Sequence, residues 1–159
     1  MSLQIQWIRI GKELPRVLEI ENATFENPWG ESDFKRAMDK RNHVCMVAKD
    51  DQGNVVGYMV YHLLSTGINL LVMAVDARHQ GRGIGRAMVD KLKSKLTPNQ
   101  RKRIVLDVRE SNLGGQLFFR SMGFMATQVL KGHWDHSQED AYRMQYMCEV
   151  PAPALAEVN

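Results

Sequence analysis

The clearest pattern in the chain is an apolar, strand-like run that leads almost directly into an amphipathic helix. Residues 68–75 are nearly all apolar, as in a buried strand. Beyond a glycine-rich stretch, apolar side chains recur every four residues, which is the spacing of one helix face: Ile84, Met88, Leu92 and Leu96. We therefore expect a helix over 83–96 that ends at Thr97-Pro98.

Periodic and alternating apolar positions predict further elements on both sides of this pair. A first helix is expected over 14–24, with Leu14, Leu18, Ile20 and Ala23 turned inward. The other expected elements are strands near 3–8, 44–49, 55–64, 104–109, 124–133 and 141–149, and helices over 32–41, capped by Ser32, and over 112–122.

The glycine-rich stretch has the features of an anion-binding turn. Gly81, Gly83 and Gly85 let the backbone turn sharply and approach a ligand closely. The first N–H groups of a helix lack partners inside the helix and carry its positive end. Arg82 and Arg86 add charged donors that suit phosphate oxygens. We therefore expect a phosphate-bearing ligand between the strand end and the helix start.

Two phosphate-binding motifs do not fit this stretch. The chain has no G-x-x-x-x-G-K-[ST], and its glycines form G-x-G-x-G rather than G-x-G-x-x-G. The segment Gln80-x-x-Gly83-x-Gly85 instead resembles the acetyl-CoA signature Q/R-x-x-G-x-G/A of the GNAT superfamily of N-acetyltransferases. The alternative interpretation is a glycine-rich turn that binds nothing.

A second block, over 106–124, resembles a later part of the same superfamily. A strand ending Leu-Asp-Val-Arg leads to Ser111 or Asn112, either of which suits a helix N-cap, and Gly123-Phe124 follows the helix. Gly114 and Gly115 in the first turn indicate either a ligand against the backbone or tight helix packing.

With Asn27-Pro28-Trp29 and Glu139-Asp140-Ala141, this block resembles the ribosomal-protein-alanine N-acetyltransferases (the RimI type). Those enzymes acetylate the N-terminal α-amine of a ribosomal protein. The resemblance implies the GNAT fold of the α/β (α+β) class, as one domain over 1–149. That fold is a mixed, largely antiparallel seven-stranded sheet flanked by about four helices, in the order β-α-α-β-β-β-α-β-α-β-β.

Composition narrows the setting without changing this interpretation. The 159 residues are 44% hydrophobic and 25% charged, as in ordinary globular proteins, and the residues from 150 to 159 read as a disordered tail. No apolar run suits a membrane helix and no signal peptide is evident, and the two cysteines lack metal-ligand spacing, so we expect a cytoplasmic protein with no metal. A net charge of +3 does not indicate a dedicated nucleic-acid binder.

The resemblance also implies where acetyl-CoA lies. The pantetheine arm would run between the strands of Val75 and Asp107, with the thioester carbonyl at an N–H near Val75 that stabilises the oxyanion. The pyrophosphate would lie on the glycine turn, and Asn112 would hold the arm from the other side. The residues implied to bind the cofactor are Met73, Ala74, Val75, Gln80, Gly81, Arg82, Gly83, Ile84, Gly85, Arg86 and Asn112.

For catalysis, the resemblance implies that the family's glutamate base corresponds to Asp107. Its side chain is one methylene shorter, so it would act through a water. The alternative is that Asp107 merely pairs with a nearby arginine. The family's tyrosine acid corresponds to Phe119, which has no proton to give. The residues expected to frame the acceptor pocket are Asn27, Pro28, Trp29, His133 and Trp134.

Three hypotheses about the function remain at this point, two of them differing in the acceptor. The leading one is a peptide or protein N-terminus. The second is a small amine, a lysine or an antibiotic, which the acidic Glu21, Glu26 and Glu31 near the first loop keep open. The third is a non-catalytic CoA-binding module, for which the phenylalanine at 119 is the argument. The sequence leaves open whether the chain is a monomer or a homodimer.

Overall fold

The computed structural model describes residues 2–134 and 137–149. The tail predicted over 150–159 lies outside the described residues. Within them, no helix is both long and apolar enough to cross a membrane.

One seven-stranded sheet organises the chain, with the strand order β1-β2-β3-β4-β5-β7-β6. Neighbouring strands are antiparallel except β4 and β5, which are parallel. The predicted mixed, largely antiparallel sheet is therefore confirmed. The strands are β1 (Gln4–Trp7), β2 (His43–Lys49), β3 (Val55–Leu63), β4 (Gly67–Val75), β5 (Arg103–Arg109), β6 (Met125–Leu130) and β7 (Ala141–Met147).

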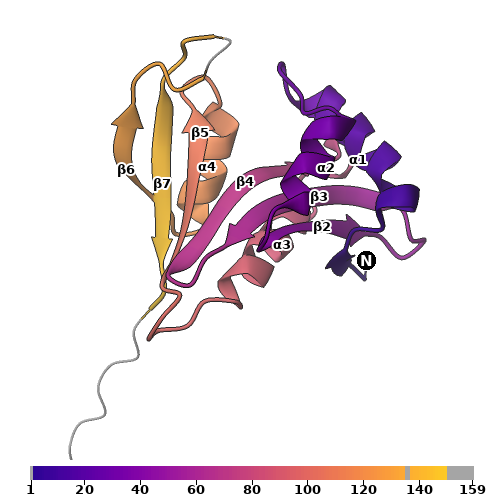
Figure 1. Cartoon of the computed structure of the whole chain (residues 1–159), viewed down its shortest axis with the longest axis horizontal. Helices are drawn as coiled ribbons and strands as arrows, with labels where there is room; N and C mark the ends of the chain where they lie inside the picture. The colour runs from indigo at the N-terminus through magenta and orange to yellow at the C-terminus, as the bar shows by residue number, and fades with distance from the viewer. Residues whose placement is uncertain (1, 135–136, 150–159) are drawn as a thin grey trace, which may run out of the picture.

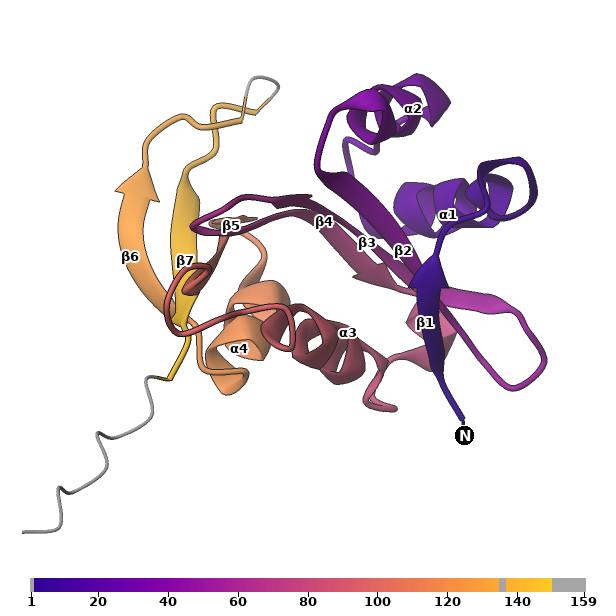
Figure 2. The same cartoon turned by 60° about the horizontal axis from the view of Figure 1, so that its bottom comes forward.

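Helices cover both faces of the sheet (Figure 2). α1 (Ile10–Thr24) and α2 (Glu31–Asp39) lie on one face, and α3 (Ile84–Lys93) and α4 (Leu113–Ser121) lie on the other. A short 3-10 turn, Ala77–His79, connects β4 to the glycine-rich turn before α3. The element order is the predicted one.

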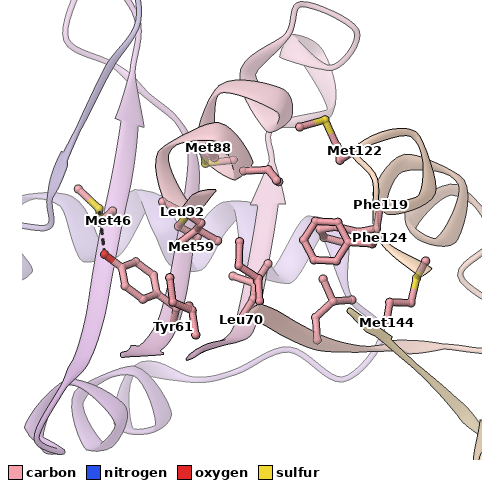
Figure 3. Packing of buried hydrophobic residues seen from close by; sticks show 14 of the residues in the cluster. Met46, Met59, Tyr61, Leu70, Met88, Leu92, Phe119, Met122, Phe124 and Met144 are labelled. Atoms are coloured by element: carbon pink, nitrogen blue, oxygen red, sulfur yellow. Dashed lines mark hydrogen bonds between the residues drawn. The ribbon is translucent and has the colours of Figure 1, made fainter. Parts of the chain in front are cut away.

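Two apolar cores hold these layers together. The larger core joins the sheet to α3 and α4, and Figure 3 shows Met88 and Leu92 of α3 and Phe119 of α4 around the strand residues Met59 and Leu70. The smaller core packs α1 and α2 on the opposite face of the sheet. Its buried side chains include Leu14, Val17, Ile20, Phe34, Val47, Tyr58 and Val60.

α1 begins four residues earlier than the sequence predicts. The Arg9 carbonyl accepts from the N–H groups of Lys12 and Glu13, and the Arg9 N–H donates to the Glu13 carboxylate, so a full turn forms before Leu14. The inward face then runs through Val17 and Glu21. The prediction that Ala23 points inward is wrong, because that position lies on the exposed side of the helix.

α2 also begins differently from the prediction. The expected cap, Ser32, lies inside the helix, and Gly30 is the N-cap. The Asp33 carboxylate accepts from the Gly30 N–H at 2.9 Å, so an acidic side chain in the first turn does the capping. The C-terminal strands and α3 are shorter than predicted by a few residues, as is common at element ends.

Phe34 should be the main anchor of the smaller core. Its ring is fully buried and makes edge contacts with the rings of Trp29 at 5.2 Å and Tyr58 at 5.8 Å. Replacing it with alanine leaves a cavity, so Phe34→Ala should lower the free energy of unfolding by about 3–5 kcal/mol in urea denaturation. The control is Leu113→Ala at an exposed position, which should change it by less than about 0.5 kcal/mol. Equal small effects from both variants would contradict this account of the core.

Candidate active site

The candidate site begins where β4 and β5 separate. The two strands pair over three residues only, from Gly67 opposite Arg103 to Asn69 opposite Val105. β4 then continues to Val75 and β5 to Arg109, and the strands diverge (Figure 1). Backbone groups on the facing edges therefore have no ladder partner across the gap.

A bulge in β4 lies at the start of this gap. Val60 pairs with Val72 and Tyr61 with Leu70, so Leu71 has no partner on β3. Beyond it, the Asp76 N–H donates to the Val56 carbonyl of β3 at 2.8 Å. Because backbone groups alternate along an antiparallel strand, Met73 and Val75 direct theirs to the opposite edge, toward the gap.

A cavity opens at this gap, and many of the predicted site residues line it. Its walls come from the end of α1, the α1–α2 loop, β4, β5, α4 with its N-cap, and the β6–β7 loop. The predicted residues in its lining are Asn27, Trp29, Met73, Asp107, Asn112, Phe119 and Trp134. Pro28, His133, Ala74, Val75 and the glycine turn are not part of this lining.

The glycine turn has the backbone geometry that an anion site requires. Gly81 and Gly83 have φ angles of 76° and 82°, in the left-handed region that favours glycine. Gly83 is the N-cap of α3, and no side chain caps that helix. The first N–H groups of α3 are therefore open to a ligand. Arg82 and Arg86 beside them are exposed and form no ion pair with the residues that the structure describes.

Gly85 serves helix packing as well as the turn. A Cβ at this position would lie 3.2 Å from Cζ of Phe118, so the absence of a side chain allows α3 to approach α4. This contact places the first turn of α3 against Phe118, near the end of α4. Close helix packing, which the sequence suggested for Gly114 and Gly115, is thus found at Gly85.

Of the two predicted caps, Ser111 and Asn112, it is Asn112 that forms the N-cap of α4. Its Oδ1 accepts from the Gly115 N–H at 2.9 Å, and a Cβ at Gly115 would lie 2.7 Å from Nδ2 of Asn112. The glycine at 115 is thus explained by this cap. Gly114 has open space around it. Asn112 also lines the cavity, from the α4 side of the gap.

Asp107 lines the cavity with its carboxylate already engaged. Arg143 of β7 donates to both oxygens, from Nε at 2.9 Å and from Nη2 at 3.1 Å. Nε2 of His133 lies 3.3 Å from Oδ2. The arginine pairing that the sequence left as an alternative is present, in bidentate form.

Phe119 contributes an apolar wall to the cavity. Its ring makes edge contacts with Phe118 at 5.0 Å and Phe124 at 5.3 Å, and Phe124 in turn packs against Tyr146 at 5.7 Å. Position 119 therefore belongs both to the larger core and to the cavity.

Two tryptophans wall the remaining side. Trp29, from the loop after α1, packs on Phe34 of the smaller core. Trp134 lies beneath the guanidinium of Arg109, whose carbon is 4.3 Å from the ring centre, and Arg109 is held by Glu139 at 3.3 Å. These contacts fix both rings at the edge of the cavity.

Glu21 is the cavity residue that the sequence analysis did not assign to catalysis. It lies on α1, is 2% exposed, and accepts hydrogen bonds from the Tyr58 hydroxyl and, at 2.9 Å, from the Trp29 N–H. Burial raises the pKa of its carboxyl to about 6, despite the opposing effect of the Trp29 N–H. The signal in the sequence was its spacing: it follows Val17 by four residues and Leu14 by seven, on the inward face.

Comparison with known proteins gives a consistent result. Residues 14–124 match the family model described as Acetyltransferase (GNAT) family. The [ribosomal protein bS18]-alanine N-acetyltransferase of Salmonella typhimurium is 26% identical over 134 residues, covering 83% of this chain and 89% of that protein.

Two solved structures are similar over nearly the whole fold. Ard1 from Thermoplasma volcanium has a TM-score of 0.80 at 23% identity and covers 94% of this chain and 100% of that chain. The ribosomal-protein-S18-alanine N-acetyltransferase from Escherichia coli has a TM-score of 0.78 at 21% identity and covers 97% and 99%.

The raised pKa of Glu21 predicts a pH effect on stability. Between its usual value of 4.5 and about 6, the folded state binds more protons than the unfolded state, so the contribution of Glu21 to stability falls as pH rises through this window. Glu21→Gln removes that titration and keeps a carbonyl acceptor. From pH 4 to pH 7 the variant should therefore gain roughly 1–2 kcal/mol relative to the parent in urea denaturation. A constant difference across this range would contradict the buried-carboxyl account.

Proposed function

We propose that this chain, which belongs to the acetyltransferase (GNAT) family, transfers an acetyl group to the α-amine at a polypeptide N-terminus. Family membership makes the chain an N-acetyltransferase with acetyl-CoA as the acetyl donor. The acceptor and the roles of individual residues are the proposal. A ribosomal-protein N-terminus is one such acceptor, because the Salmonella relative is named for it, and it would fit the predicted cytoplasmic location.

The observation that carries the proposal is the character of the cavity at the β4–β5 gap. Its outer walls are tryptophan rings, and both of its carboxylates, Glu21 and Asp107, already accept hydrogen bonds from the protein. A polycationic small amine would need several unengaged carboxylates. A single α-amine followed by a peptide backbone suits aromatic walls with few charges.

Acetyl-CoA supplies an activated thioester, and this chain supplies the groups that hold it. The Met73 and Val75 backbone groups that face the gap suit an extended amide-containing arm. The Val75 N–H is proposed to stabilise the oxyanion. The open N–H groups at the start of α3, with Arg82 and Arg86 beside them, suit the pyrophosphate. Asn112 is proposed to contact the arm from α4.

The energetics of the attacking group also favour an α-amine. An amine attacks the thioester only when neutral. At neutral pH, deprotonation costs an α-amine roughly 1 kcal/mol and a lysine about 4–5 kcal/mol. A modest base therefore suffices. That Asp107 is this base stays a prediction. Because Arg143 donates to both of its oxygens, Asp107 is also a candidate for a residue that only positions other groups.

The leaving thiolate does not require a protein acid. Phe119 offers no proton, and a thiol with a pKa of about 8.5 leaves as a thiolate that solvent can protonate.

The proposed acceptor is tested by a thiol-release assay with acetyl-CoA. Short peptides with free N-termini, including ribosomal-protein N-termini, should be acetylated, and the same peptides with a blocked α-amine should not. Polyamines and aminoglycosides serve as the comparison set. Turnover of these small amines alone would overturn the proposed acceptor.

The proposed pyrophosphate site is tested at Gly83, with Gly53 as a matched control. Both glycines have a positive φ, 82° and 81°, with no atom within 4 Å of an added Cβ. Both alanine variants should lose about 1–2 kcal/mol of stability. Only Gly83→Ala should also raise the acetyl-CoA Kd, by roughly tenfold or more, in isothermal calorimetry. Equal acetyl-CoA affinity in the two variants would place the pyrophosphate elsewhere.

A further inference from the structure

We infer that Glu21 takes the proton from the acceptor amine before that amine attacks acetyl-CoA. The inference deepens the proposed function and rests on it for the kind of amine. It assigns to a residue of α1 the step that the family resemblance assigns to a residue of β5.

The contrast between two glutamates on α1 is the first argument. Glu13 is 3% exposed and Glu21 is 2% exposed. Glu13 forms an ion pair with Lys49, and hydrogen bonds and charge from Lys49 and Arg9 leave its pKa lowered even though burial opposes them. Glu21 has only a hydroxyl and a backbone N–H as partners, and within residues 2–134 and 137–149 no cation pairs with it.

A buried carboxylate without a cation is costly, so a role beyond packing is expected for it. Glu21 lines the cavity at the β4–β5 gap, where an amine must reach the thioester. The ammonium of the acceptor would supply the missing positive charge. The structure therefore provides a site for a cation on Glu21 in the place where the acceptor is proposed to bind.

The electrostatic surroundings suit a proton acceptor near neutral pH. Burial raises the pKa of Glu21 to about 6, the Trp29 N–H lowers it, and Asp33 of α2 raises it. The other charged groups of the cavity are already paired: Asp107 with Arg143, and Arg109 with Glu139. At pH 7 Glu21 is thus mostly ionised and still more basic than an ordinary carboxylate.

The proton balance of the step is simple. One ammonium proton moves to the Glu21 carboxylate, directly or through one water, and the freed lone pair bonds to the thioester carbon. The C–S bond then breaks, and the second nitrogen proton goes to the thiolate. The products are the amide, CoA thiol and one proton, which Glu21 returns to solvent.

This base is matched to one kind of amine. From an α-amine, whose pKa is about 7.7–8.0, transfer to Glu21 is uphill by about 100-fold. From a lysine, with a pKa of about 10.4, it is uphill by more than about 10⁴-fold. Asp107, held at both oxygens by Arg143 and approached by His133, is a positioning residue in this account.

The first test compares pH profiles of kcat/KM for Glu21→Gln and the parent. The glutamine keeps a carbonyl acceptor for the Tyr58 and Trp29 donors. We expect a loss of roughly 10²- to 10⁴-fold in kcat, an acetyl-CoA Kd within twofold of the parent, and loss of the inflection near pH 6 on the acidic limb. Glu19→Gln, at an exposed glutamate of the same helix that does not line the cavity, is the matched control and should match the parent.

Tyr58→Phe provides a second readout that a structural role would not change. It removes the hydroxyl that stabilises the ionised carboxylate but leaves the carboxylate itself. The acidic inflection should therefore move to higher pH while the rate at high pH is kept. An inflection that stays in place would overturn the inference.

The outcomes separate this inference from the acceptor proposal. All variants are assayed on whichever primary amine the parent acetylates best. If that amine is a small molecule, the proposed acceptor fails, and the Glu21→Gln and Tyr58→Phe profiles on it still decide the inference. The inference fails if Glu21→Gln keeps full activity and an unchanged acidic limb while Asp107→Asn loses the activity and that limb. Asp107 would then be the residue that takes the proton from the amine.

Discussion

The parting of β4 from β5 is the constraint on which the rest of the site depends. Three paired residues hold the strands together before they diverge, and the bulge at Leu71 turns β4 away at that point. The separation leaves backbone edges unpaired and opens the cavity, which the N-cap residue of α4 also lines. The glycine turn that starts α3 follows the end of β4, outside that lining. In this fold, the unpaired strand edges that a sheet would normally satisfy become the candidate binding surface.

Charge is distributed unevenly around that surface. The helix start at Gly83 and the exposed arginines beside it form a cationic end without a protein partner among the described residues. The cavity contains two carboxylates whose hydrogen-bond partners come from other elements. The partner of Asp107 is on β7, and the partners of Glu21 are on β3 and the α1–α2 loop. A phosphate-bearing cofactor suits the cationic helix start, and the proposed cationic acceptor suits the cavity with its carboxylates.

Local sequence patterns predicted the helices and strands. Contacts between residues far apart in the chain determine the features that the sequence did not predict. The four-residue repeat through Met88 and Leu92 correctly predicted α3, and the N-cap of α4 was correctly narrowed to Ser111 or Asn112, because both features depend on neighbouring residues. The early start of α1 depends on a buried Glu13 that pairs with Lys49 of β2. The partner of Asp107 comes from the β5–β7 register, and the inward turn of Glu21 depends on Tyr58 of β3. Because glutamates are mostly exposed in proteins, residue type alone would place Glu13 and Glu21 on the surface.

The short β4–β5 pairing also gives the sheet a pivot. Gly67 lies at its base, where an added Cβ would meet the Arg103 carbonyl oxygen at 2.8 Å. Any side chain there would act as a wedge between the half-sheet β1–β4 and the half-sheet β5–β7. Because the gap widens from this point, a small displacement at Gly67 becomes a larger one at Val75. Gly67, which is not part of the cavity lining, thus limits how close the two half-sheets can come and so the width of the gap between them.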